Sequence, residues 1–184
     1  GSPFERWARL CDNLADVLRS PQQRQFLSRI REAASHVMAL NELNADLLLF
    51  LILRHDHGDC ESYGVAHSLH VACVCSLLSQ RLDWSRDDQQ RAIGAALTMN
   101  LSTIELQGQC ARQSTPLTRR QRELNQAHPA EASMMLRAAG LDDLDWLAAV
   151  EDHHERLRGA GYPSGRTDPG ALSQMLRLTD QFTA

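Results

Sequence analysis

The sequence predicts an all-α fold, in which several helices pack into one compact bundle. Apolar residues recur at spacings of three and four along most of the 184 residues, as in helices with one buried face. Only ten glycines and six prolines interrupt this pattern, and the segments between them are too long to be strands. A chain of this length buries about 70% of the surface that it exposes when unfolded, so it needs no disulfide or metal to fold.

The N-terminal third predicts three helices. Residues 4–18 place their apolar side chains on one face. Pro21 stands where a second helix can start, and that helix extends to about Leu40. Asn44 caps a third helix, whose residues 47–53 are apolar on every side. We therefore expect this third helix to be buried all round.

Two long helices are expected in the middle of the chain. Residues 63–82 are apolar on almost every face and contain His67 and His70. Ser85 and Asp88 resemble a capping box at the start of the next helix, which covers about residues 86–106. Both patterns predict helices at the centre of the bundle.

The last third predicts shorter helices. Thr118 with Gln121 starts one helix, and Pro129 lies in the first turn of another that ends at Gly140. Asp143 begins a helix that closes with residues 151–155, and the final helix begins near Pro169.

Composition and charge exclude several classes of protein. Hydrophobic residues make up 43% of the chain, which excludes intrinsic disorder, and the net charge of −4 argues against a partner that is a nucleic-acid polymer. The longest apolar run, residues 47–53, is far shorter than the roughly 20 residues that span a bilayer. No signal-peptide pattern is present, and the five cysteines form no CxxC pair, so we expect a cytoplasmic protein with reduced thiols and no membrane contact.

The pair His153-His154 is the strongest candidate for chemistry. Neighbours on a helix diverge by about 100°, so two adjacent imidazoles reach one cleft most easily at a helix end or across a two-metal centre. This pair stands at the predicted end of a helix. A glycine-rich turn, residues 158–165, follows, and its backbone amides can approach a phosphate closely.

The segment from His153 to Pro163 is similar to the HH-E-x-x-D-G-x-G-Y-P signature of HD-GYP domains, with Arg158 in place of the aspartate. The resemblance covers residues 63–184, about two thirds of the chain. It implies an HD-GYP-type helical bundle over residues 61–184, which we expect to be truncated at its C-terminus. Residues 3–60 are then an N-terminal helical extension packed on this core.

HD-GYP domains hold two or three metal ions, commonly iron or manganese, and hydrolyse cyclic di-GMP. The metals polarise the phosphate and generate the attacking hydroxide. The resemblance implies that Gly159, Gly161, Tyr162 and Pro163 form the loop next to the substrate phosphate. It implies as metal ligands His67, His128, His153, His154 and Asp180.

The departures from the family pattern lie at its centre. Met99 and Asn100 occupy the positions of the His-Asp dyad, and Thr103 replaces the lysine that neutralises the substrate phosphate. A thioether is a poor ligand for these ions, and a neutral amide cannot bridge two of them as a carboxylate does. Tyr63 replaces the glutamate of members with three metals. We therefore expect one divalent transition metal, iron or manganese, or none.

These observations predict a degenerate HD-GYP-like signalling domain with little or no phosphodiesterase activity. It acts by binding a nucleotide such as cyclic di-GMP, or a protein partner. The alternative is an active metal-dependent phosphohydrolase that hydrolyses cyclic di-GMP or another phosphate ester, with Asn100 and a water in the missing ligand roles. The sequence leaves the enzymatic status and the oligomeric state open, and a homodimer is one alternative.

Two further segments carry polar side chains. Residues 55–59, His-Asp-His-Gly-Asp, are either a separate metal loop or, as we favour, an ordinary turn. The arginines within residues 112–122 either attract a nucleotide phosphate or form the solvated start of a helix, and we favour the second interpretation.

Overall fold

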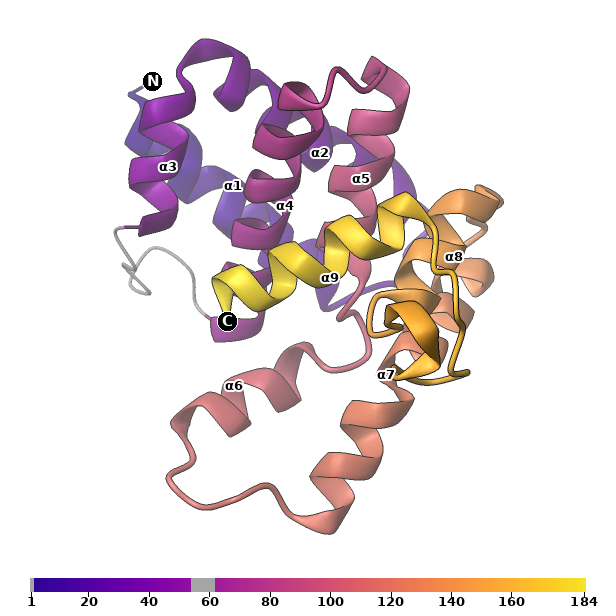
Figure 1. Ribbon diagram of the computed structural model, residues 1–184. Helices are drawn as coiled ribbons and strands as arrows, with labels where there is room; N and C mark the ends of the chain where they lie inside the picture. Colours follow the sequence, from indigo (N-terminus) through magenta and orange to yellow (C-terminus); the bar gives the residue numbers. More distant parts are fainter. Residues whose placement is uncertain (1, 54–61) are drawn as a thin grey trace.

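The computed structural model describes residues 2–53 and 62–184, and every regular element within these residues is a helix (Figure 1). The predicted all-α fold is confirmed. The α-helices are α1 Pro3–Leu18, α2 Phe26–Leu43, α3 Ala45–Leu53, α4 Tyr63–Arg81, α5 Arg86–Thr98, α6 Ile104–Arg112, α7 Arg119–Ala138, α8 Leu144–Asp152 and α9 Ala171–Thr183, and a 3-10 turn covers Leu157–Gly159.

The predicted helix caps agree with the structure. The hydroxyl of Ser85 accepts the amide of Asp88 at the start of α5, and Asp143 caps α8 through the amide of Trp146. Thr118 and Gln121 form a complete capping box at the start of α7. Each of these side chains satisfies an amide that has no partner within its own helix.

Three predicted boundaries are wrong. The second helix begins at Phe26 and not at Pro21, because residues 20–26 are held by two successive turn hydrogen bonds. The predicted helix 86–106 is broken into α5 and α6 by a turn at residues 99–103, which we call the α5–α6 turn. Its amides bond three residues back, from Leu101 to Thr98 and from Thr103 to Asn100.

The third wrong boundary is at Pro129, which lies inside the continuous helix α7 and does not start a new one. Proline has no amide to donate to the carbonyl of Asn125, four residues earlier. The Nδ1 atom of His128 bonds that carbonyl instead, at 2.5 Å. A side chain therefore satisfies the acceptor that the proline leaves free.

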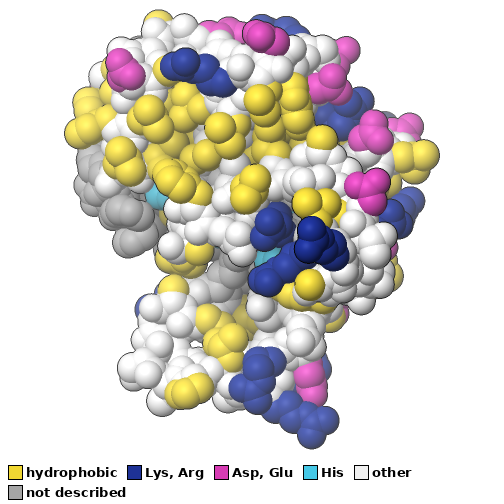
Figure 2. All heavy atoms as spheres, viewed as in Figure 1, with side chains coloured by type: hydrophobic (Ala, Val, Ile, Leu, Met, Phe, Trp, Pro, Cys, Tyr) yellow, Lys and Arg dark blue, Asp and Glu magenta, His cyan; other side chains and the backbone are white. Residues whose placement is uncertain are grey.

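Helix α3 is only half buried, so the prediction that it is buried all round is wrong. Leu48, Leu51 and Ile52 are buried, whereas Phe50 and Leu53 are 52% and 64% exposed. The helix packs against α2 and α4 on one side only, which leaves its other apolar face open. Figure 2 shows apolar side chains spread over the face of the molecule that carries α3, α4 and α9.

The centre of the bundle is formed by α4 and α5, and α9 crosses both (Figure 1). Two glycines permit close contacts there. A Cβ on Gly94 of α5 would lie 2.2 Å from the ring of Trp146 in α8, and one on Gly64 of α4 would lie 2.4 Å from the carbonyl oxygen of Ile104 in α6. The indole of Trp146 also donates to the hydroxyl of Thr98 at 3.0 Å. These contacts bring α5 and α8 together, and with them the residues of the site below.

The N-terminal helices share this core. Helices α1 and α2 contact each other and α4, and α2 also contacts α5. Trp7 of α1 stacks on His70 of α4 with 6.1 Å between ring centroids, and Asn41 of α2 donates to the hydroxyl of Ser76 in α4.

The cysteines and the apolar helices test two further predictions, those of reduced thiols and of a chain without a membrane span. Cys73, Cys75 and Cys110 are free thiols, and burial raises the pKa of Cys75 to about 12. Cys11 is disulfide-bonded, so the prediction of reduced thiols throughout is wrong at this position. Among the described helices, none alone has the length and apolar composition needed to cross a bilayer; α2 and α3 reach that measure only when taken together across a 115° bend.

Candidate metal centre and ligand cavity

Three imidazoles meet where α7 passes the end of α8. His128 comes from α7, and His153 and His154 follow directly after the last residue of α8. One ring nitrogen from each of the three lies within 4.8 Å of the others. We call these three residues the histidine cluster. The adjacent histidines converge because the helix ends between Asp152 and His153, three residues before its predicted end at Glu155.

Backbone carbonyls orient two of the three rings. The Nδ1 atom of His153 bonds the carbonyl of Val150 at 2.6 Å, as that of His128 bonds Asn125. A carbonyl can only accept, so both Nδ1 atoms carry the proton and both Nε2 atoms are free to bind a metal. The two Nε2 atoms are 3.1 Å apart. Nitrogens that share one ion at about 2.1 Å each lie about 3 Å from each other, so this spacing fits a common ion.

Burial keeps the histidine cluster neutral. It lowers the pKa of His128, and burial together with the neighbouring imidazoles lowers the pKa of His153 much further. Burial, and then His128, lowers the pKa of His154 to about 4. Neutral imidazole is the form that binds a metal, so near pH 7 all three rings are ready to act as ligands without first losing a proton.

His67 of α4 and Asp180 of α9 lie across a cavity from the histidine cluster and bond each other. The Nε2 atom of His67 is 2.8 Å from a carboxylate oxygen of Asp180. Burial acts to raise the pKa of Asp180, but the bond from His67 and the nearby imidazoles lower it below its ordinary value. The ring of Tyr63 stacks on that of His67, with 5.9 Å between centroids.

The structure brings the five predicted metal ligands around one cavity of about 270 Å³, which we call the histidine cavity. Four of the five line it, and His153 lies directly behind His128 with no exposed surface. The other lining residues come from the α5–α6 turn, α6, α7 and the two ends of the chain segment 63–184. Those with polar side chains are Tyr63, Asn100, Gln107, Cys110 and Asn125.

Met99 and Asn100, which the resemblance places at the dyad positions, lie in the α5–α6 turn. Met99 is fully buried and does not line the cavity, whereas Asn100 is 2% exposed and faces it. Thr103 is also buried, and its hydroxyl donates back to the carbonyl of Asn100 at 3.3 Å. This wall of the cavity thus offers neither a charged side chain nor a second imidazole.

Unpartnered polar atoms point to a ligand in this cavity. Among the described residues, five buried side-chain nitrogens or oxygens have no hydrogen-bond partner, and three of them belong to residues that line it. Each such atom costs about 1–3 kcal/mol when it stays unbonded. The three are Nδ1 of His67, Nδ2 of Asn100 and Oε1 of Gln107. No motif in the sequence singles out Gln107, which reasoning from the sequence therefore missed.

The glycine-rich turn holds the histidine pair in place. A Cβ on Gly161 would lie 2.5 Å from the carbonyl oxygen of His154, and the ring of Tyr162 stacks on that of His154 at 4.7 Å. The carboxylate of Glu155 is 1% exposed and accepts the amides of Ser164 and Arg166. Gly159, Gly161, Tyr162 and Pro163 are not among the residues that line the cavity, and their contact with a phosphate stays a prediction.

Arg158 adopts a left-handed backbone conformation, with φ of 69°. Aspartate tolerates this conformation better than arginine, because its short side chain bonds the local backbone. The departure from the signature at this position therefore places strain in the turn.

Of the two remaining polar segments, the structure describes only the arginine-rich one. Residues 55–59 lie outside the described residues. Within residues 112–122, Arg119 pairs with Glu123 at 2.8 Å, and Arg122 bonds the carbonyl of Leu117. None of these arginines lines the histidine cavity, so the interpretation as a solvated helix start agrees with the structure.

Comparison with known proteins places this site in a family context. The model of the HD domain family matches residues 22–184. The fold is similar to that of Bd1817, a HDG"Y"P protein from Bdellovibrio bacteriovorus, with a TM-score of 0.75 and 16% identity over 95% of this chain. The match covers 57% of the Bdellovibrio chain, so the present chain spans little more than half its length. No curated protein matches the sequence.

Proposed function

This chain belongs to the HD domain family, and we propose that it is a degenerate, phosphohydrolase-like signalling domain that binds a nucleotide with little or no turnover. One observation carries the proposal. The histidine cluster brings together three imidazoles, whereas Asn100 in the cavity wall and Met99 buried beside it occupy the positions that the resemblance gives to the dyad. The site keeps the residues for one metal ion and lacks those for a second.

The histidine cluster suits a single divalent ion such as iron or manganese. Its donor set is three neutral imidazoles, two of which are oriented by backbone carbonyls. A bound ion would supply a positive charge next to a ligand phosphate and polarise its oxygen. The protein residues hold the imidazoles at the correct spacing and, through burial, keep them unprotonated.

A second ion lacks its bridging ligand. His67 and Asp180, which the family pattern assigns to metal binding, bond each other at 2.8 Å through Nε2 of His67. Between them and the histidine cluster the family has a carboxylate, and this chain has the neutral amide of Asn100. Two-metal hydrolysis depends on ions that share one hydroxide, so we expect conventional turnover to be severely impaired.

The same amide favours direct binding of an anion. The Nδ2 atom of Asn100 is an N–H donor that is buried, unpartnered and part of the cavity wall. A carboxylate at this position would repel a phosphate oxygen, whereas an amide can donate to it. Oε1 of Gln107 adds an acceptor for a ligand N–H. A nucleotide such as cyclic di-GMP offers both kinds of group.

The test is metal content by plasma mass spectrometry on protein purified without chelators or added metal, followed by assays of cyclic di-GMP binding and hydrolysis. We expect one transition-metal ion per chain, lost in His153→Ala, and saturable nucleotide binding without turnover. Two ions per chain with turnover would overturn the proposal. Asn100→Ala should weaken nucleotide binding while leaving the metal content unchanged, which separates the two parts of the site.

A second candidate function, an active hydrolase that uses one metal, is favoured by the histidine cluster itself. Three imidazoles with an open fourth position form the ligand set of several catalytic metal sites. Turnover of a phosphodiester by the unmodified protein, abolished in His153→Ala, would establish this alternative.

A further inference from the structure

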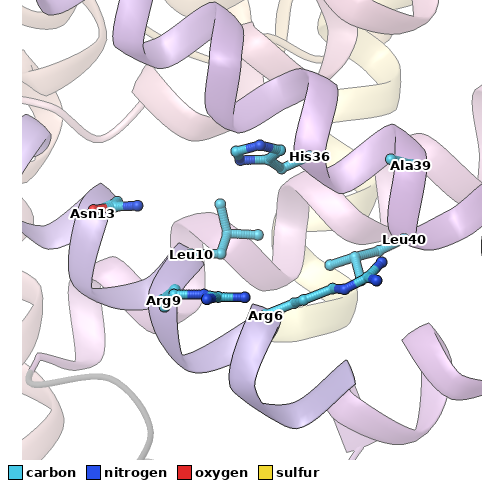
Figure 3. Close-up of a pocket in the computed structure, with 7 residues that line it drawn as sticks. All are labelled: Arg6, Arg9, Leu10, Asn13, His36, Ala39 and Leu40. Atoms are coloured by element: carbon cyan, nitrogen blue, oxygen red, sulfur yellow. The ribbon is translucent and has the colours of Figure 1, made fainter. Parts of the chain in front are cut away.

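A second cavity, of about 390 Å³, lies between α1 and α2 (Figure 3). It shares no lining residue with the histidine cavity. Helix α1 precedes the residues that match the HD domain family, so half of this cavity is built by a segment outside that match. Its principal lining residues are Arg6, Arg9, Leu10 and Asn13 of α1 and His36 and Leu40 of α2. We call it the α1–α2 cavity.

The cavity has an apolar floor and a polar rim. Leu10 and Leu40 are 3% and 6% exposed and belong to the hydrophobic core, so the floor is fixed by packing. Arg6, Arg9 and His36 are exposed around it. Figure 3 shows Leu10 between His36 on one side and the two arginines on the other. A ligand in this cavity meets an apolar surface below and charged donors at one side.

The charge of the lining has one sign. It contains two guanidinium groups and no carboxylate. Neither guanidinium forms an ion pair or a hydrogen bond within the described part of the chain, whereas Arg29, also on α2, is paired with Asp16 at 2.7 Å. Arg6 and Arg9 are three residues apart, so they project from the same face of α1. Their donors are therefore available to one anion.

The surroundings set the direction in which that anion lies. A neighbouring hollow shares Leu10, Asn13 and His36 with the α1–α2 cavity, and Glu32 lines it together with Arg29. Among the described residues that line either hollow, the only carboxylate is that of Glu32, and it lines the hollow that Arg6 and Arg9 do not. A negative group is attracted to the arginine end and repelled from the other.

We propose that the α1–α2 cavity binds a small organic phosphate, with the phosphate held by Arg6 and Arg9 and the organic part resting on Leu10 and Leu40. Guanidinium groups bind phosphate through paired, charge-assisted hydrogen bonds, and two of them match its double charge. The volume lies in the range of small-molecule sites, which is about 300–1,000 Å³. The apolar floor selects a phosphate that carries an organic group over inorganic phosphate.

The test is a titration of the whole protein with phenyl phosphate at constant ionic strength. The NMR signals of the backbone amides and of the arginine side chains monitor binding. We expect saturable shifts in α1 and α2, and weaker binding of both inorganic phosphate and phenol at the same signals. The double variant Arg6→Gln/Arg9→Gln should bind phenyl phosphate at least about tenfold more weakly. Glutamine keeps helix propensity, so α1 stays folded.

The matched control is Arg31→Gln/Arg137→Gln, which removes the same charge from exposed arginines that line neither cavity. It should leave the affinity within about twofold of the unmodified protein, because distant surface charges are screened by salt. Equal weakening in the control, or shifts confined to α7 and α8, would overturn the proposal. Binding of inorganic phosphate as tight as that of phenyl phosphate would overturn the role of the apolar floor.

Discussion

The wall of the histidine cavity built by α7 and α8 and the wall built by the α5–α6 turn are equally buried, yet only the first carries nitrogen ligands. His128 and His153 are held by carbonyls of their own helices, and the following turn is held by Glu155. Met99 and Asn100 are held by packing and by turn hydrogen bonds alone. The α5–α6 turn therefore closes the cavity with Asn100 alone, and the fold around it does not require a charged side chain or an imidazole at this wall.

We expect the greatest loss of stability when Glu155, which supports the wall built by α7 and α8, is replaced. Glu155→Ala removes a buried carboxylate that accepts two backbone amides, and it leaves those amides without their charged partner. We expect a loss of about 3 kcal/mol in the free energy of unfolding, together with loss of bound metal. Urea denaturation and metal content measure the two effects. Glu105→Ala, at an exposed position on α6, should change stability by less than about 0.5 kcal/mol.

Placing the family's dyad residues at positions 99 and 100 should give the α5–α6 turn metal ligands of its own. In Met99→His/Asn100→Asp, the carboxylate at position 100 lines the cavity as Asn100 does, and the imidazole at position 99 replaces a buried thioether beside it, so we expect a second ion to bind once the turn adjusts. We expect the metal content to rise by one ion per chain and phosphodiester turnover to rise about a hundredfold, which is close to 3 kcal/mol in transition-state stabilisation. If neither metal content nor turnover rises, either residues 99 and 100 are not the positions of the dyad or Thr103 and Arg158 also block the chemistry.

The contact that joins the two walls can be tested at Gly94. Gly94→Ala places a methyl group 2.2 Å from an atom of the Trp146 ring, which must shift α5 relative to α8. We expect a loss of about 2 kcal/mol in thermal or urea unfolding, the usual cost of overpacking. In Gly108→Ala the new methyl has no neighbour nearer than 3.6 Å, at the flexible end of Arg112. That control should be neutral or slightly stabilising, and equal losses in both variants would contradict the argument.

A smaller effect is expected on the pH dependence of stability, through His154 in the wall built by α7 and α8. His154 has its pKa lowered from 6.5 to about 4, so between these values the unfolded chain binds a proton that the folded protein excludes. The stability of the metal-free protein should therefore fall as the pH is lowered from 7 to 5, by about 1.8 kcal/mol from this residue. His154→Gln should reduce that slope in urea denaturation. A slope unchanged by the substitution would show that other groups cause it.

The sequence singled out His153-His154 because a helix end followed by a glycine-rich turn is a local pattern, whereas His128 entered only through the family resemblance. It also predicted that His67 and Asp180 would reach the same site, although this depended on the family resemblance. It did not predict that these two residues bond each other, since residues 113 positions apart meet only through the packing of α4 against α9. Gln107 was missed for the same reason.

The failures at the level of helices have local physical causes. The exposed side of α3 was missed because an apolar run predicts burial and does not show how many neighbours are available to provide it. The break after α5 was missed because Asn100 and Thr103 are compatible with a helix. Their turn also depends on contacts between helices, such as the bond from the hydroxyl of Ser102 to the carbonyl of His128 in α7. Pro129 was placed at a helix start because that is its commonest position in a helix.

Pro129 also helps to fix the tautomer and the ring orientation of His128. An alanine there would supply an amide aimed at the carbonyl of Asn125, in competition with the imidazole. His128 could then exchange tautomers and rotate, and the free energy of fixing one orientation would have to come from the bound metal or ligand. The proline thus transfers an entropic cost from the moment of binding to the moment of folding. The proline removes one backbone hydrogen bond from α7, and it thereby preorganises the neighbouring His128 for binding.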